Sequence, residues 1–352
     1  MTIDTSCLTY LDVLKELGDR RKHLLLGNGF SIGCDPRFAY ASLYDHACEA
    51  GLSDSAKRLF DRLGTNNFEG VMRALDDAQW VAEEYELLQE GDASAILDDL
   101  ELVKTALISA VGEVHPEDAS CLSVDRVHAG RAFIAPYFNV FTVNYDLLLY
   151  WLVAAGDFKF QDGFGTDPDD YDARSLIFEG STRGHDGIYF LHGALHLFRG
   201  RSFTRKHSWS RTGTKLTELV KTGLAEKQYP LFVAEGTWEK KLAQIARSHY
   251  LAHCYDKLTR IQNGLVCYGL SLGESDGHLT RAIAHNLDLK RVFIGVFDDF
   301  DGSDGLALRA RAGELSTMRE KALGAKKRDS PELQVSFFDA KSADAWKSRM
   351  PE

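Results

Sequence analysis

Short runs of consecutive apolar residues recur along this chain, separated by longer segments in which apolar and polar positions mix. Runs of four to eight residues, rich in β-branched and aromatic side chains, are typical of buried strands. Because the apolar character is continuous rather than alternating, the pattern predicts a mainly parallel sheet covered on both faces. Seven segments have this pattern: His23–Leu26, Phe138–Val143, Ile188–Leu191, Leu231–Ala234, Leu265–Tyr268, Val292–Phe297 and Val335–Phe338.

Segments with helical periodicity lie between these predicted strands. Gly236–Leu258 and Asp276–Leu287, for example, carry apolar residues at three- and four-residue spacing. Strands that alternate with helices indicate right-handed crossover connections. The chain is therefore expected to form a doubly wound, mainly parallel, Rossmann-like α/β fold.

The connection between the first two predicted strands has a different pattern. It contains consecutive amphipathic helices, which we expect at Phe68–Leu88, Ala93–Val114 and Pro116–Phe133. A crossover needs only a dozen or more residues, so this connection holds more than a crossover helix. We therefore predict two parts, an α/β domain made of residues 1–38 and 136–352, and a helical insert at residues 39–135.

Composition and charge narrow the class of protein. The chain of 352 residues is 44% hydrophobic and 26% charged, as is usual for soluble globular proteins. Its formal net charge of −11 argues against binding to nucleic acid phosphates. The first residues lack a secretory-signal pattern, and the apolar run Leu147–Ala155 is far shorter than the ~20 residues that a membrane span needs. We expect a cytoplasmic protein without nucleic acid or membrane partners.

Two segments of biased charge are expected to be solvated loops. Residues 199–211 combine five basic side chains with Phe203 and Trp209, which could contact an acidic partner, although a solvated basic loop is the commoner case in an acidic chain. Asp162–Asp172 is acidic and rich in turn-forming residues. Neither segment predicts a specific activity.

A glycine-rich turn directly follows the first predicted strand, at Gly27-Asn28-Gly29-Phe30-Ser31-Ile32-Gly33. Gly27 permits a sharp turn, and Gly29 would let the backbone approach a pyrophosphate. The spacing departs by one residue from the usual dinucleotide fingerprint, and no acidic residue follows at the expected distance. Taken alone, the turn fits a phosphate site and a structural turn equally well.

Three later segments also follow predicted strands, where open α/β sheets bind ligands. They are Asn144-Tyr145-Asp146, His192-Gly193 and Gly269-Leu270-Ser271. Together with Gly27–Ser31, and in this order, they resemble the sirtuins and their bacterial sirtuin-like relatives. That family carries a glycine-rich loop ending in serine, an Asn-x-Asp segment, a catalytic His-Gly and a G-x-S segment. The resemblance covers about residues 22–38 and 138–297.

The resemblance implies an NAD site with Asn144 and His192 as the catalytic residues. The residues implied to bind NAD are Gly27, Asn28, Gly29, Phe30, Ser31, Asp146, Gly269 and Ser271. Phe38 is an approximate counterpart of the family's aromatic residue near nicotinamide. Asp146 has an alternative role, because an aspartate just before a helix often caps it.

The departures from the family concern zinc. Deacylase sirtuins carry two C-x-x-C pairs after the His-Gly segment, whereas this chain has six cysteines without such a pair and none between Leu122 and His253. His192 and His196, like His249 and His253, have a metal-ligand spacing but lack the glutamate of the H-E-x-x-H pattern. We therefore expect no metal site and no zinc, as in the defence-associated sirtuin-like proteins.

Those relatives imply the function. We expect an enzyme that hydrolyses NAD to nicotinamide and ADP-ribose, in antiphage defence by NAD depletion. A neutral His192 can accept a proton, and the Asn144 amide can hold a ribose hydroxyl or a water. The alternatives are an NAD-dependent protein deacylase and a non-catalytic sensor of NAD or another nucleotide. Amphipathic helices must bury their apolar faces, so we also expect a homo-oligomer. The resemblance to the sirtuin-like defence proteins implies a companion such as a ring-forming ATPase or another defence protein.

Overall fold

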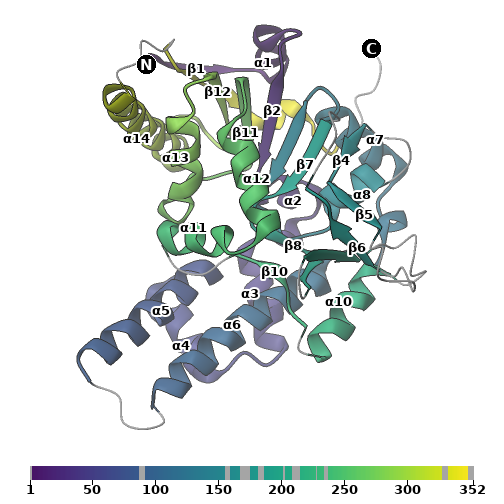
Figure 1. The fold of residues 1–352 in the computed structure, drawn as a ribbon, viewed down its shortest axis with the longest axis vertical. Coiled ribbons are helices and arrows are strands. Elements are labelled where there is room, and N and C mark those ends of the chain that lie inside the picture. Colours follow the sequence, from purple (N-terminus) through teal and green to yellow (C-terminus); the bar gives the residue numbers. More distant parts are fainter. Residues whose placement is uncertain are drawn as a thin grey trace.

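Eight parallel strands form the centre of the fold (Figure 1). The computed structural model describes residues 2–86, 92–154, 159–166, 175–180, 186–200, 203–207, 215–226, 228–233, 237–326 and 332–347. Every neighbouring pair in this sheet is parallel. In spatial order the strands are β1 (Thr2–Leu8), β13 (Gln334–Asp339), β12 (Leu289–Val296), β11 (Asn263–Tyr268), β2 (Lys22–Leu26), β3 (Asn139–Thr142), β7 (Asp186–Phe190) and β4 (Phe160–Gln161). The expected α/β fold with a mainly parallel sheet is confirmed.

Burial explains why the continuous apolar runs became the inner strands. Leu24, Leu25 and Leu26 of β2 are fully buried, as are Leu265 and Val266 of β11. Six of the seven predicted strands lie in this sheet. The seventh prediction was wrong in its placement, because β10 (Pro230–Phe232) pairs antiparallel with β8 (Gly193–Arg199). A three-residue apolar run cannot reveal which sheet it joins.

A second, antiparallel sheet lies beside the first. Its order is β10, β8, β9 (Thr204–His207), β6 (Ser175–Phe178) and β5 (Phe164–Thr166). The expectation of two solvated loops was therefore wrong in part, since β9 and β5 fall within them. Lys206 of β9 is 6% exposed and forms an ion pair with Asp162, so its charge is buried but compensated. Residues 167–172, 201–202 and 208–211 of these segments lie outside the described residues.

Helices surround the two sheets (Figure 1). The predicted helix Gly236–Leu258 is two helices, because Ser248 caps the second through a bond from the Leu251 amide. The helices of this outer layer are α1 (Tyr10–Leu17), α2 (Asn28–Cys34), α7 (Val124–Ile134), α8 (Leu148–Ala154), α10 (Leu216–Ala225), α11 (Trp238–Ala246), α12 (His249–Thr259), α13 (Gly277–His285) and α14 (Ser303–Lys326), and α11 packs on α12 and α13. Short 3₁₀ turns occur at η1 (Pro36–Phe38), η2 (Ala119–Cys121), η3 (Glu274–Asp276) and η4 (Ala340–Ala343).

Four helices between β2 and β3 extend away from the parallel sheet, at the lower end of Figure 1. They are α3 (Tyr40–Glu49), α4 (Asp54–Leu63), α5 (Phe68–Glu84) and α6 (Asp92–Val114). The predicted helix Pro116–Phe133 begins only at Val124, after the capping residue Ser123, and this helix α7 packs on the sheet through Phe133, whose ring lies 4.9 Å from that of Tyr268. Among the described helices, none is long and apolar enough to cross a membrane.

Candidate functional site

The carboxyl ends of four neighbouring strands meet at the point where the sheet topology reverses. Strand β2 has β3 on one side and β11 on the other, and β7 lies next to β3. Open α/β sheets bind ligands at such a reversal. A cavity of about 300 Å³ lies there, and its lining includes Gly27, Asn28, Gly29, Asn144, Asp146, His192, Gly269 and Ser271. Eight of the ten residues singled out in the sequence therefore share one cavity.

The two glycine segments pack directly against each other. The Gly27 amide donates to the Tyr268 carbonyl over 2.9 Å, and the Gly29 amide donates to the Gly269 carbonyl over 3.0 Å. A Cβ on Gly29 would lie 2.6 Å from the Gly269 Cα, and Gly269 itself has a φ of +71°. These glycines are thus required by the contact between the turns, and the Gly29 amide is engaged within the protein rather than directed at a pyrophosphate.

Phe30 and Ser31, the two remaining predicted residues, lie behind the cavity wall. The Phe30 ring is 1% exposed and packs 4.7 Å from the ring of Trp346, whose indole nitrogen donates to the Phe30 carbonyl over 2.7 Å. Ser31 is fully buried, and its hydroxyl forms hydrogen bonds with Asn144 and Asp146. Both residues shape the turn and the wall instead of facing the cavity.

Asn144 is held by two hydrogen bonds and keeps a free acceptor. Its Nδ2 donates to the Gly27 carbonyl over 3.0 Å and to the Ser31 hydroxyl over 2.8 Å. Because a carbonyl can only accept, these bonds fix which end of the amide is the nitrogen. The Asn144 Oδ1 is buried and has no hydrogen-bond partner among the described residues. A buried acceptor of this kind favours a ligand with a donor group.

Asp146 completes the network behind Asn144. The Ser31 hydroxyl donates to Asp146 Oδ2 over 2.5 Å, and the Leu148 amide donates to Asp146 Oδ1 over 2.8 Å. Burial raises the pKa of Asp146, although both hydrogen bonds oppose the rise. Asp146 therefore orders the segment between β3 and α8, which agrees with the capping alternative.

His192 lies in the turn between β7 and β8 and is 2% exposed. Gly193 adopts a φ of +85°, and a Cβ there would lie 1.9 Å from the Leu231 carbonyl, so only glycine lets the chain turn against β10. The His192 Nε2 lies 2.8 Å from the His278 Nε2. Burial lowers the pKa of His192 well below its ordinary value, and His278 and Lys241 lower it further. Two uncharged rings are thus paired, one donating and one accepting.

A buried lysine and two carboxylates complete the polar wall, and sequence reasoning missed them. Lys241 of α11 is 0% exposed, and its Nζ lies 2.7 Å from Glu69 Oε2 and 3.6 Å from Asp276 Oδ1. Burial opposes the lysine charge, but the two carboxylates outweigh it and raise the pKa of Lys241. Burial raises the pKa of Asp276 to about 6, assisted by Glu69 and opposed by Lys241. The three residues come from segments that are far apart in the sequence, so no spacing pattern indicated the group.

The helices between β2 and β3 form part of the same cavity wall. Glu69 comes from α5, and the other lining residues from this region are Tyr40, Leu43, Asn67, Leu107 and Val111. Phe38, expected near nicotinamide, also lines the cavity. The segment at residues 39–135 therefore contributes side chains to the wall of the cavity.

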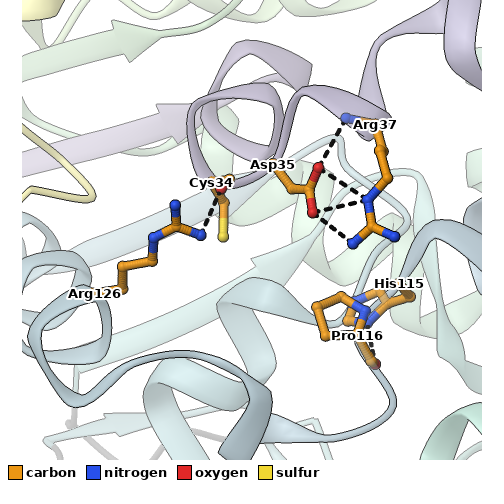
Figure 2. A network of polar contacts seen from close by, with 6 residues as sticks. All are labelled: Cys34, Asp35, Arg37, His115, Pro116 and Arg126. Atoms are coloured by element: carbon orange, nitrogen blue, oxygen red, sulfur yellow. Dashed lines mark hydrogen bonds and ion pairs between the residues drawn. The ribbon is translucent and has the colours of Figure 1, made fainter.

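Polar contacts anchor the segments around the cavity (Figure 2). Arg126 of α7 donates to the Cys34 carbonyl over 3.0 Å, and the Asp35 carboxylate accepts three bonds from the Arg37 side chain and one from its amide. His115 Nδ1 bonds the Pro116 carbonyl over 3.1 Å, and its Nε2 accepts from the Leu147 amide over 2.9 Å. His115 thereby ties the end of α6 to the segment that carries Asn144.

Metal-ligating side chains also gather at this wall. One candidate ligand atom each from His192, Asp276 and His278 lies within 4.8 Å of the other two. The histidine pairs suggested by sequence spacing are not this group, since His196 lies in β8 and His249 and His253 lie on α12. The expectation that the chain has no metal site was based on sequence spacing alone, which does not connect His192 with Asp276 and His278.

Comparison with known proteins places the chain in a family. A search of curated proteins gave no match. A family model described as "Domain of unknown function (DUF4917)" matches residues 24–346, a range that begins within β2 and contains every residue that lines the cavity. The chain therefore belongs to the DUF4917 family.

Proposed function

We propose that this protein is a sirtuin-like NAD hydrolase with a Rossmann-like NAD-binding fold, cleaving the bond between nicotinamide and ribose. One observation carries the proposal: the unpaired Asn144 Oδ1 and the imidazole of His192 line the same cavity, at the reversal point of a parallel sheet. An acceptor and an uncharged base are the two groups that this hydrolysis needs from the protein.

In the proposed reaction, water adds to the anomeric carbon of the ribose as the bond to nicotinamide breaks. The products are ADP-ribose and nicotinamide, and one proton is released from the water. The transition state resembles an oxocarbenium ion, so the protein mainly orients the reactants and accommodates positive charge. The Asn144 Oδ1 accepts a hydrogen bond from a ribose hydroxyl or from the attacking water, which satisfies its buried lone pair.

His192 supplies the proton acceptor. We assign the shared proton of the 2.8 Å contact between the two Nε2 atoms to His192, which leaves the lone pair on its Nδ1 for the water or the ribose hydroxyl. The charge of Lys241 and the burial of the ring both disfavour a lasting imidazolium. His192 therefore orients the water and passes the proton to solvent water in the cavity, rather than storing it.

The cavity volume of about 300 Å³ is at the lower end of the range for ligand sites. It suits the nicotinamide and its ribose, the part of NAD where the reaction occurs. The walls are apolar at Phe38, Leu107 and Val111, which favours the flat aromatic ring of nicotinamide over a phosphate group of NAD. The adenosine end would extend out of the cavity along the edge of the sheet.

The test is nicotinamide release from NAD by the purified full-length protein. We expect release by the wild type and a loss of at least about a hundredfold in Asn144→Ala and in His192→Ala. Asn286→Ala is the matched control, because Asn286 is also buried and bonded to a carbonyl, that of Ile261, but lies outside the cavity lining. Full activity in either site variant, confirmed as folded by circular dichroism, would refute the assignment.

The same assay separates the alternatives. A deacylase would release nicotinamide only with an acyl-lysine peptide present, whereas a sensor would bind NAD without cleaving it. For the hydrolase we propose a role in antiphage defence by NAD depletion. Infection of cells that carry the wild-type or the His192→Ala protein tests that role, with loss of cellular NAD and of phage yield as the readout.

Assembly is part of this proposal. An NAD-depleting enzyme must be restrained, and a homo-oligomer, with a companion such as a ring-forming ATPase, would provide the restraint. Trp80 and Tyr85 of the α5 region are 63% and 72% exposed, which is unusual for large aromatic side chains and suits an interface. Light scattering during chromatography gives the oligomeric state, and a concentration-independent monomer that is fully active alone would refute this part.

A further inference from the structure

Two buried imidazoles and a carboxylate converge on one wall of the cavity from three different elements. His192 lies before β8, Asp276 ends η3, and His278 is the second residue of α13. The two Nε2 atoms are 2.8 Å apart, and the candidate ligand atoms of all three side chains lie within 4.8 Å of one another. Imidazole and carboxylate are ordinary ligands of divalent transition metals.

The distance between the imidazoles suits two neighbouring ligands of one ion. Nitrogen ligands lie about 2.1 Å from zinc, so two nitrogens 2.8 Å apart subtend an angle of roughly 85° at the ion. That angle is close to the right angle between adjacent ligands of an octahedral ion, whereas tetrahedral zinc would hold the two nitrogens about 3.4 Å apart, so the rings would separate slightly on binding zinc. Asp276 would take a third position, and water from the cavity would take the open ones, since both His192 and Asp276 line the cavity.

The charges near these three side chains favour the binding of a cation, with moderate affinity. Glu69, Asp276 and Lys241 together carry one net negative charge, which an ion would neutralise. The ammonium group of Lys241 repels the ion, since its Nζ lies 3.6 Å from Asp276 Oδ1. With the shared proton on His192, His278 carries its own proton on Nδ1, which is buried without a hydrogen-bond partner in the part of the chain that the structure describes, and its Nε2 lone pair already suits an ion.

We propose that His192, His278 and Asp276 bind one divalent transition-metal ion, such as Zn²⁺, and that the bound ion inhibits the hydrolysis of NAD in the cavity. Metal on Nε2 of His192 leaves the ring proton on Nδ1, so the ring loses the lone pair that accepts the proton. Binding requires no change in the number of protons on the two imidazoles, only a change of tautomer. The inhibition rests on the proposed hydrolysis, whereas the binding does not.

Binding is tested first, without NAD. Calorimetric titration of the chelator-treated full-length protein with Zn²⁺ should give one site per chain. Asp276→Asn should weaken that site about tenfold or more, and His278→Gln should remove it. His253→Gln is the matched control, because His253 lies on α12 outside the cluster and forms the i,i+4 pair with His249 that could hold zinc at the surface.

Inhibition is tested second, by nicotinamide release with increasing Zn²⁺ and then excess chelator. We expect at least a tenfold, reversible loss in the wild type, and no loss in His278→Gln relative to its own activity. A wild-type protein that binds no zinc, or one whose site survives both Asp276→Asn and His278→Gln, would overturn the metal site even if NAD is cleaved. Conversely, zinc binding without any NAD cleavage would refute the hydrolase alone. Asp276→Asn keeps the test valid if His278→Gln fails to fold.

Discussion

The Asn144 amide nitrogen lies 2.8 Å from the Ser31 hydroxyl, which in turn donates to Asp146. This chain of bonds fixes the orientation of Asn144, so that its oxygen remains free at the cavity. The bonded residues come from the turns after β2 and β3, which only the pairing of these strands brings together. Ser31 therefore acts on the site from behind the wall, without facing the cavity.

Ser31→Ala should weaken both stability and activity. It removes the donor to buried Asp146 and the acceptor of Asn144, and an unsatisfied buried polar group costs about 1–3 kcal/mol. With Asn144 free to turn, nicotinamide release should fall about tenfold or more. Urea unfolding and the NAD assay measure the two effects. Ser336→Ala, another buried serine, on β13, serves as the control and should leave activity unchanged.

Gly29→Ala should destabilise the fold although alanine is the better helix former. The added Cβ would lie 2.6 Å from the Gly269 Cα, so the two turns must separate, at a cost of about 2–3 kcal/mol. Gly70→Ala provides the contrast, because Gly70 lies in α5 with no atom within 4 Å of the new Cβ. That variant should gain about 0.5–1 kcal/mol. Equal effects in urea unfolding would contradict the close packing of the turns.

His115 should make the fold sensitive to acid. Burial lowers its pKa to about 4, while the bond from Nδ1 to Pro116 opposes the shift, and its Nε2 accepts from the Leu147 amide. The unfolded chain binds a proton near pH 6.5 and the folded one does not, so stability falls as the pH drops from 6.5 towards 4. Between pH 7 and pH 5 the loss is about 2 kcal/mol.

The comparison with His115→Gln isolates this effect. Glutamine does not titrate, and its side-chain oxygen can still accept from Leu147. The wild type should therefore lose about 2 kcal/mol more than the variant between pH 7 and pH 5, in urea unfolding at both values. Parallel losses in the two proteins would show that His115 is not the acid-sensitive group.

Lys241 and its neighbour Lys240 should differ sharply in their effects on stability. Lys241→Met leaves Glu69 and Asp276 without their buried counter-charge and should cost about 3–5 kcal/mol. Lys240 pairs with Asp76 at a largely exposed position, so Lys240→Met should cost less than about 1 kcal/mol. Adding Glu69→Gln to Lys241→Met should restore part of the loss. Similar losses in both single variants would contradict a buried charge cluster.

Local patterns predicted the parallel strands well, because a strand that is buried on both faces consists of consecutive apolar residues. The runs at Leu24–Leu26 and Leu265–Tyr268 are apolar without reference to any other segment. Helix ends were predicted less well, since they depend on single capping residues such as Ser123 and Ser248. The strand β10 joined the other sheet because its partner β8 comes from an earlier part of the chain and lies within reach only after folding.

The sequence by itself determined which side chains stand at the ends of the inner strands, because the end of an apolar run is a local feature. Asn144, His192 and the glycine turns were identified in this way, and they line one cavity. Only the tertiary structure decided what surrounds them. His278 lies 86 residues from His192, and Glu69 lies 172 residues from Lys241, so their contacts depend on how several crossovers and the helices between β2 and β3 pack. Side chains that meet across such distances have no common spacing in the sequence, and their chemistry appears only when the elements that carry them are packed together.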